Sequence, residues 1–230
     1  MPVSEHAPSR EAAAGRRMVE IQRGRILAAM VEVCAEYGAA NVTVAHVVER
    51  AGVSRRTFYE LYRDREDCFL ATFDDGIERA SRYVLEGYDA EAKWVARMRL
   101  VLTHLLAFLD VEPGIGQLLI VGSLGAGPEA LSRRADAIAH IVAFVQEGHS
   151  EAKPGAEPPP LTAEGIVGGV LSVLHGRLLD VLAPWADLDG SPDDRHEASL
   201  LELTGPLMSM IVLPYLGSAA ARRELARAVP

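Results

Sequence analysis

Apolar residues return at every third or fourth position over much of the chain, which is the spacing of one face of an α-helix. The first such run begins near Val19 and has two neighbouring stripes. One stripe holds Ile26, Met30, Val33 and Tyr37, and the other holds Leu27, Val31 and Cys34. This broad apolar face predicts a helix buried on one side, and Gly38 is the residue type that ends such a helix.

Three shorter helical segments follow, each preceded by a capping residue. Thr43 is a good N-cap for a short amphipathic helix that runs to Ala51, where Gly52 interrupts the pattern. Ser54 caps a second helix, which ends near Tyr62, and Asp64 caps the helix after it. Short helices joined by a tight glycine-containing turn match the helix-turn-helix plan.

The remaining pattern predicts helices near residues 65–88, 92–110, 116–124, 128–149, 162–182, 193–215 and 218–228. Residues 150–160 are rich in proline and lack core-forming residues, so we expect a loop there. Residues 1–17 are polar and small and are expected to form a mostly disordered arm. No segment has strand periodicity worth assigning. The chain is therefore predicted to be all-α, with an arm at 1–17, a helix-turn-helix domain at 18–65 and a larger helical domain at 66–230.

The net charge of −9 is distributed unevenly along the chain. Residues 1–65 hold ten Lys/Arg and eight Asp/Glu, a balance of +2, whereas residues 66–230 hold thirteen and twenty-four, a balance of −11. With this distribution, the mildly basic residues 1–65 would be oriented toward a polyanion such as DNA, and the acidic residues 66–230 would be kept away from it. An acidic surface is also a common aid to solubility, so the asymmetry alone decides nothing.

Several other classes of protein find little support in the sequence. The two cysteines, Cys34 and Cys68, lie inside apolar helical patterns and give neither a disulfide framework nor metal-ligand spacing. We expect no cofactor and no metal site. The sequence shows no signal peptide, and no apolar stretch of about 18 residues is free of a charge or a Pro/Gly break. We therefore expect a cytoplasmic protein without a membrane span.

A helical wheel separates two faces of the segment that starts at Ser54. Ser54, Phe58, Leu61 and Tyr62 cluster on one side, and Arg55, Arg56, Tyr59 and Glu60 fall on the other. The first face can pack on the preceding helices, which leaves two guanidiniums and a phenol free. Arginine forms bidentate hydrogen bonds with guanine in the major groove, and hydroxyl groups bind phosphates.

The segment from Thr43 to Phe69 resembles the DNA-binding signature of the TetR family. The agreement lies in Thr43, the run Ala51-Gly52-Val53-Ser54, the run Thr57-Phe58-Tyr59, Tyr62, and the charged turn at residues 63–66. It covers roughly residues 20–70, whereas the rest of the chain matches only in length and helical character. The sequence departs from the common pattern at Arg56, where a small residue is frequent.

The resemblance implies a DNA-binding site, whose residues would be Thr43, Ser54, Arg55, Arg56, Thr57, Tyr59 and Arg65. Thr43 would contact a phosphate, Arg55, Arg56 and Thr57 would face bases or flanking phosphates, and Tyr59 and Arg65 would contact the DNA backbone. Phe58 and Tyr62 would belong to the core. Whether Arg56 reads a base or only adds phosphate affinity stays open. Arg10, Arg16, Arg17 and Arg23 could enter the adjacent minor groove.

The family template also implies a regulatory and dimerising domain after the fourth helix. The window 162–182 carries Gly165, Gly168, Gly169 and Gly176, which would permit close helix approach, and the window 200–216 is too apolar for a surface helix. We expect a homodimer through residues 162–182 and 193–215, with an internal core helix as the alternative. Pro206 and Pro214 should bend or end the last segment. A two-fold dimer would bind a palindromic operator on double-stranded DNA.

A small-molecule effector is expected to bind among the middle helices. The candidate lining residues are Trp94, Met98, Phe108, Leu118, Phe144, Leu174 and His175, although each fits an ordinary core position as well. The scarcity of charge on these faces favours an apolar or amphipathic ligand, which would release a repressor from its operator. An activator stays possible. Two alternatives from other classes are a helical interaction protein without DNA readout and an enzyme, although Gly122-Ser123-Leu124-Gly125 misses the Gly-x-Ser-x-Gly pattern.

Overall fold

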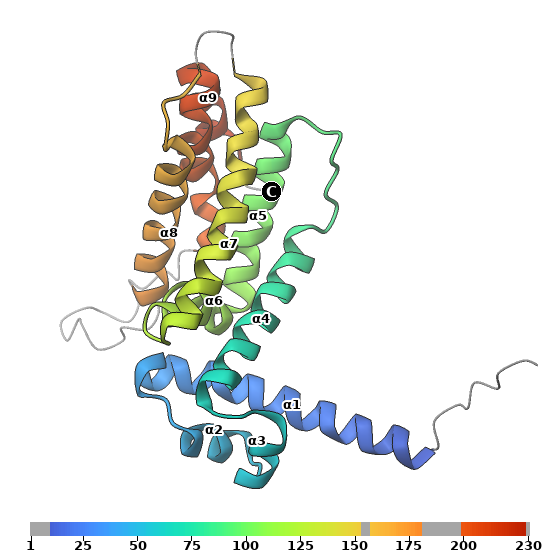
Figure 1. Ribbon diagram of the computed structural model, residues 1–230. Helices are drawn as coiled ribbons and strands as arrows, with labels where there is room; N and C mark the ends of the chain where they lie inside the picture. Colours follow the sequence, from blue (N-terminus) through green and yellow to red (C-terminus); the bar gives the residue numbers. More distant parts are fainter. Residues whose placement is uncertain (1–9, 153–156, 181–198, 229–230) are drawn as a thin grey trace, which may run out of the picture.

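The computed structural model describes residues 10–152, 157–180 and 199–228, and within these ranges the chain forms helices and turns without a β-strand. The all-α prediction is therefore confirmed. Figure 1 shows the first three helices, α1 to α3, at the base of the molecule. The helix α4 leads from this base into a body in which α5, α7, α8 and α9 run side by side.

The base has the helix order that the capping residues predict. The helix α1 (Arg10–Tyr37) ends at Gly38, which adopts a positive φ of 74°. The short helix α2 (Val44–Ala51) is capped by Thr43 and ends at Gly52 in the left-handed conformation, with φ 61°. The helix α3 (Arg55–Leu61) starts after Ser54, whose side chain accepts a hydrogen bond from the backbone of Thr57.

The N-terminal arm is helical over the part that the structure describes. Residues 10–17, which the composition predicts to be disordered, form the first turns of α1. The prediction was wrong there because Glu11 and the three alanines after it are good helix formers that continue the following helix without a break. Residues 1–9 of the predicted arm lie outside the described residues. The beginning of α1 projects away from the body (Figure 1).

Two hydrophobic cores meet along α4 (Arg65–Val84), which starts after its N-cap Asp64. Cys68, Phe69 and Phe73 belong to the core of the base, together with Leu118 and Ala130 from the body. The second core fills the body, and Val31 and Leu119 pack against both. The core of the base therefore extends past the domain division predicted between residues 65 and 66, and it is in contact with the core of the body.

The middle of the body is built from α5 (Trp94–Val111), α6 (Pro113–Ile120), a 3-10 turn (Gly122–Leu124), α7 (Pro128–Gln146) and a 3-10 turn (Glu147–Glu151). The chain bends by 111° between α5 and the segment after it. The helix α6 begins three residues earlier than position 116, where we expected it. Pro113 is the reason, since proline is favoured in the first turn of a helix.

The last part of the body consists of α8 (Thr162–Asp180), a 3-10 turn (Leu200–Leu203) and α9 (Thr204–Ala226). The expected helical residues 181–182 and 193–198 lie outside the described residues. The two final helices that we expected form one element, which is interrupted at Gly217 with φ 77° and ψ 176°. Pro206 lies in its first turn, where proline is tolerated, and Pro214 lies inside it, shortly before the break.

The segment Leu200–Ala226 is long and apolar enough to cross a membrane by length and composition. In this structure it packs as a core helix of the bundle, where Met208 and Val212 are fully buried and Ile211 is 3% exposed. The helix lies against α5 and α8. Much of the window 200–216 is therefore buried, as predicted, whereas Leu213 of that window is 48% exposed.

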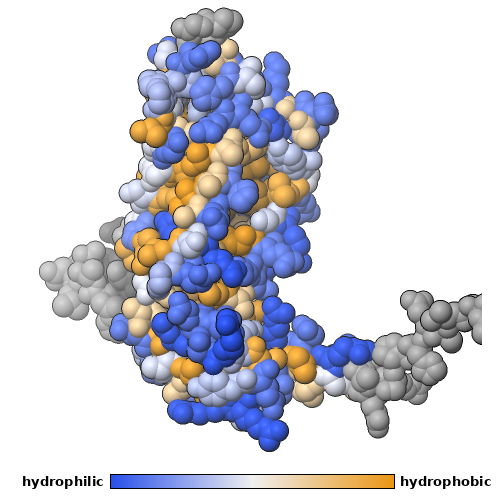
Figure 2. Space-filling view, in the orientation of Figure 1, coloured by the Kyte–Doolittle hydropathy of each residue, from blue (hydrophilic) through white to orange (hydrophobic). Residues whose placement is uncertain are grey.

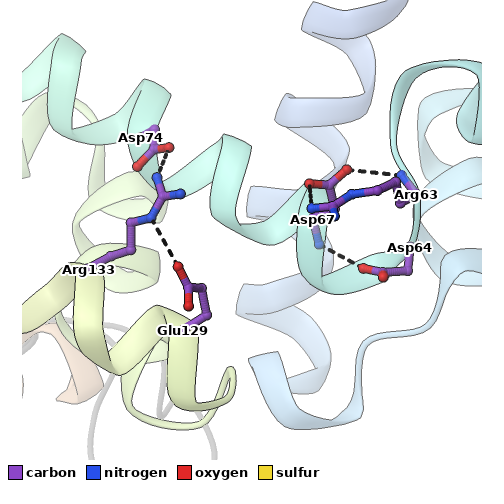
Figure 3. A network of polar contacts seen from close by, with 6 residues as sticks. All are labelled: Arg63, Asp64, Asp67, Asp74, Glu129 and Arg133. Carbon is purple, nitrogen blue, oxygen red and sulfur yellow. Dashed lines mark hydrogen bonds and ion pairs between the residues drawn. The ribbon is translucent and has the colours of Figure 1, made fainter.

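Polar contacts also connect base and body (Figure 3). Arg133 of α7 forms an ion pair with Asp74 of α4 and lies 3.9 Å from Glu129. On the other side of the figure, Arg63 binds Asp67 at 2.9 Å, and Asp64 caps the start of α4. The start of α4 is therefore fixed by its own cap, and its middle is fixed by the body.

Candidate nucleic-acid interface

The helix α3 has a buried and an exposed face, as its helical wheel predicts. Phe58 is completely buried and Tyr62 is 6% exposed, so both belong to the core of the base. Arg55 and Arg56 are exposed, and Tyr59 is 55% exposed. The space-filling view shows hydrophilic residues over the lower end of the molecule, where α2 and α3 lie (Figure 2).

Hydroxyl side chains fix the start of α2 and of α3. The Thr43 hydroxyl accepts a hydrogen bond from the backbone of His46 at 3.3 Å, and the imidazole of His46 accepts one from the backbone of Thr43 at 3.4 Å. The Ser54 hydroxyl accepts a bond from the backbone of Thr57 at 3.0 Å and lies 2.9 Å from its hydroxyl. Three of the predicted site residues therefore also take part in helix caps, and Thr43 and Ser54 are exposed as well.

The two arginines of α3 differ in their partners. Arg56 donates a hydrogen bond to Glu60 at 2.9 Å, one turn further along the helix, and this bond raises the pKa of Arg56. Arg55 forms no ion pair with any of the described residues. Arg55 is therefore the more available guanidinium, whereas Arg56 would first have to leave an exposed carboxylate, which costs little in water.

Arg65 has a structural contact that the sequence did not reveal. Its guanidinium donates a hydrogen bond to the carbonyl of Ala39 at 2.7 Å, and the side chain is partly buried. The bond connects the first turn of α4 to the turn after α1. In this conformation Arg65 holds the base together, and one of its donor groups is already used.

Further residues that sequence reasoning missed hold α2 against α1. Arg50 of α2 forms ion pairs with Glu32 at 2.9 Å and with Glu36, two residues one turn apart on α1. The pKa of Glu36 is lowered, first by a hydrogen bond from Tyr37 and then by Arg50. The ring of Tyr37 stacks on His46 with 4.4 Å between centroids. The only signal in the sequence was the pair of glutamates at helical spacing, and their partner depends on tertiary packing.

The structure does not bring the seven predicted ligand-binding residues together in one pocket. Trp94, Met98, Phe108 and Leu174 are buried in the core of the body, and Phe144 packs against it. Trp94 also donates a hydrogen bond to the carbonyl of Phe144 at 3.1 Å. Leu118 lines a small cleft beside Cys34 between base and body, and His175 lines another cleft between α7 and α8.

This arrangement has the chemistry of a nucleic-acid reader. A short exposed helix carries two guanidiniums and a phenol, and the major groove of B-DNA is wide enough to admit a helix. The capped starts of α2 and α3 offer backbone N–H groups and hydroxyls, which are typical phosphate ligands. The body lies on the opposite side of the base from α2 and α3 (Figure 1).

Comparison with known proteins finds similar sequences among bacterial regulatory proteins. Residues 26–72 match the family model of bacterial regulatory proteins of the tetR family. The nucleoid occlusion factor SlmA of Vibrio cholerae is 28% identical over 107 residues, which are 46% of this chain and 54% of that protein. An uncharacterised HTH-type transcriptional regulator of Mycobacterium tuberculosis is 39% identical over 70 residues, which are 30% of this chain and 37% of that protein. The matched stretches thus span about half of the first relative and about a third of the second.

Solved structures extend the likeness to the body. The fatty acid degradation regulator FadR from Bacillus halodurans superimposes with a TM-score of 0.63 at 14% identity, covering 83% of this chain and 94% of that one. FadR from Bacillus subtilis in complex with stearoyl-CoA gives a TM-score of 0.60 at 16% identity and covers 84% and 98%. At this identity the likeness shows a common fold over most of the chain.

Proposed function

Since the chain carries the N-terminal domain of the tetR family of bacterial regulatory proteins on a helical body with the fold of such regulators, we propose that it is a ligand-responsive transcriptional repressor. It binds a palindromic operator as a homodimer in the cytoplasm and performs no catalysis. The observation that carries the proposal is the face of α3, where Arg55 and Tyr59 are exposed directly beside the fully buried Phe58.

In this proposal the residues of the interface have separate roles. Arg55, which has no ion pair among the described residues, reads base edges, and Arg56 exchanges Glu60 for a phosphate or a base. Thr43 and Ser54 bind phosphates through hydroxyls and helix starts, Tyr59 contacts the backbone, and Thr57 faces bases or flanking phosphates. Arg65 reaches a phosphate only if its bond to Ala39 opens or if a second N–H group points outward.

The arginines at the beginning of α1 are proposed to contact phosphates. A minor groove about 6 Å wide admits an extended arm but not a helix about 10–12 Å across. Arg16 and Arg17 are exposed on a helix in this structure, so we place them at phosphates rather than in the minor groove. Contacts of this kind add affinity and salt dependence without adding sequence information.

The second copy is proposed to pack on α8 and α9. Gly165 is exposed and Gly176 is half-buried, and a methyl group added to either would meet no atom within 4 Å. Leu213 of α9 is 48% exposed. Glycines cost about 1 kcal/mol each in a helix interior, and close approach of a partner helix would explain why they are kept. Gly165→Leu should therefore convert a dimer to a monomer in sedimentation, whereas an unchanged dimer would place the interface elsewhere.

Regulation is proposed to pass through α4, because Cys68, Phe69 and Phe73 belong to the core of the base and Ala80 belongs to the core of the body. A ligand that binds one conformation of the body more tightly would change the orientation of α4. This change would alter the distance between the two α3 helices of the dimer. The complex of the Bacillus subtilis protein with stearoyl-CoA supports the idea that a body of this fold can hold a ligand.

A selection from random duplex DNA tests the proposed function, because such a selection does not require a known operator. We expect an enriched two-fold symmetric sequence whose half-sites lie about one helical turn apart, or a multiple of it. The double variant Arg55→Ala/Tyr59→Ala, selected in parallel, should enrich nothing. Equal enrichment by both proteins, or no enrichment by the native chain, would refute the proposal.

A further inference from the structure

A cleft of about 380 Å³ lies between α7 and α8 on the surface of the body. Its walls are formed by Arg134, Ile138 and Val142 from α7, and by Glu164, Gly168, Leu171, Ser172 and His175 from α8. Apolar surface gathers over these two helices on the face shown in Figure 2, between hydrophilic regions above and below. The volume lies within the range of small-molecule sites, roughly 300–1,000 Å³.

The cleft is cationic at one end and acidic at the other. Arg134 and His175 belong to the same end, because the first turns of α7 face the last turns of α8 in this antiparallel pair (Figure 1). Glu164 is eleven residues before His175, which corresponds to about 16 Å along the helix axis. This separation exceeds the Debye length of about 8 Å at physiological ionic strength, so Glu164 is largely screened from the cationic end.

Arg134 is a charge without a partner in the part of the chain that the structure describes. Its Nε atom is buried and forms no hydrogen bond with the described residues. Burial lowers its pKa, and no carboxylate offsets that effect. Its neighbour Arg133 differs, since it pairs with Asp74 and approaches Glu129. Arg134 lines the cleft, and a partly buried guanidinium without a carboxylate partner is suited to an anion.

The wall next to Arg134 is apolar. Ile138 and Val142 follow Arg134 at intervals of four residues on α7, so the three side chains form one line along the helix. Leu171 faces them from α8. The line from Arg134 to Val142 is about 12 Å long along the axis. The cleft therefore offers a cationic head site that continues into an apolar channel.

We propose that this cleft binds a small amphipathic monoanion, with its carboxylate at Arg134 and its apolar chain along Ile138, Val142 and Leu171. His175 and Ser172 offer further hydrogen-bond donors at the head end of the cleft. The inference rests on the proposed ligand-responsive function, for which it names the chemical class of the effector. The proposed effector site is thus the cleft between α7 and α8. Of the seven residues predicted from the sequence to bind a ligand, only His175 lines this cleft.

The test is a titration of the full chain with three probes of equal chain length, decanoate, decan-1-ol and decylammonium, each below its self-association concentration. Isothermal titration calorimetry should show binding of decanoate and at least tenfold weaker binding of the other two. Arg134→Met, which keeps the apolar stem of the side chain, should weaken decanoate binding about tenfold to a hundredfold. Arg177→Met, an arginine of α8 outside the cleft, is the matched control and should bind decanoate normally.

Further variants separate the head site from the rest of the cleft. Ile138→Gln should weaken decanoate binding, and Glu164→Gln should change it by no more than about twofold because of its distance from Arg134. Thermal unfolding of each variant shows that the fold is intact. Equal binding of decanoate and decan-1-ol, or normal decanoate binding by Arg134→Met, would overturn the proposal.

The outcome is independent of the proposed DNA binding, because the titration contains no DNA. If decanoate does not bind while the chain still selects a palindrome, the cleft proposal fails and the proposed function stands. If decanoate binds through Arg134 while no DNA sequence is enriched, the cleft proposal stands and the proposed function fails.

Discussion

Phe58 and Tyr59 are adjacent aromatic residues of α3 with opposite surroundings, and their substitution should separate folding from DNA binding. Phe58 is completely buried in the core of the base, whereas Tyr59 is 55% exposed. Phe58→Ala removes a whole ring from a site without solvent, which typically costs about 3–5 kcal/mol. Since small domains are stable by only about 5–15 kcal/mol, this variant should be close to unfolding.

Tyr59→Ala should leave stability nearly unchanged. The ring of Tyr59 contacts the edge of Phe58 with 5.4 Å between centroids, a pair that contributes about 1 kcal/mol at most at this exposure. The phenol is expected to bind a phosphate, so its loss should weaken operator binding about tenfold. Tyr59→Phe keeps the ring contact and removes only the hydroxyl, and it should show the same loss of affinity with native stability.

Urea unfolding followed by circular dichroism gives the stability of the three variants, and fluorescence anisotropy with the selected duplex gives their affinity. We expect Phe58→Ala to lose stability and both Tyr59 variants to lose affinity alone. If Tyr59→Ala is destabilised as much as Phe58→Ala, the assignment of the two faces of α3 is wrong. If Tyr59→Ala binds the operator like the native chain, Tyr59 is only a surface residue.

Three other features of the fold lead to measurable consequences. Arg99 and Glu224 form a buried ion pair with 2.7 Å between Nε and Oε2 and side-chain exposures of 9% and 12%. Glu224→Leu should therefore lower the free energy of unfolding in urea by about 3–5 kcal/mol, and changing both residues to leucine should recover most of this loss. A double variant as unstable as the single one would show that the two charges are not coupled. Burial raises the pKa of the Cys34 and Cys68 thiols from 9.0 to about 12, so both should resist a thiol reagent at pH 8 until urea is added. Rapid reaction of the native chain with the thiol reagent would contradict the burial of both thiols. The folded state keeps the thiol protons between pH 9 and 12 while the unfolded state loses them, so the free energy of unfolding should fall as pH rises through this window. A methyl group at Gly116 of α6 would lie 2.5 Å from a methyl carbon of Leu109 of α5. Gly116→Ala should therefore lower the melting temperature by an amount equivalent to about 1–3 kcal/mol. An unchanged melting temperature would mean that α5 and α6 have room to move apart.

Local signals in the sequence predicted the base of the molecule well. Thr43, Ser54 and Asp64 all cap the helices that they were expected to cap, and Gly52 ends α2 in the left-handed conformation. Such caps depend on residues only three positions apart, so they can be recognised without tertiary information. The exposed face of α3 followed from helical periodicity together with a buried partner face. The DNA contacts assigned to that face stay a prediction.

The features that sequence reasoning missed depend on contacts between distant residues. Arg65 is close in sequence to the predicted DNA-binding residues, but its donor is used by the carbonyl of Ala39, 26 positions earlier. The ion pair of Arg50 with Glu32 likewise spans 18 positions. The large apolar side chains that we expected to bind a ligand mostly became core, whereas Arg134 gave no signal because its role depends on the gap between α7 and α8.

The most direct test of the central claim is the salt dependence of binding to the selected palindrome, measured by fluorescence anisotropy for the native chain and for Arg55→Ala. Arg223→Ala, an exposed arginine at the end of α9, serves as the control. We predict that the logarithm of the association constant falls linearly with the logarithm of salt, by about 0.9 for each phosphate contacted. Arg55→Ala should weaken binding about tenfold to a hundredfold and relax the preference at one base pair of each half-site, while the control binds normally. Equal and weak binding of the native chain and Arg55→Ala to every duplex would contradict the account.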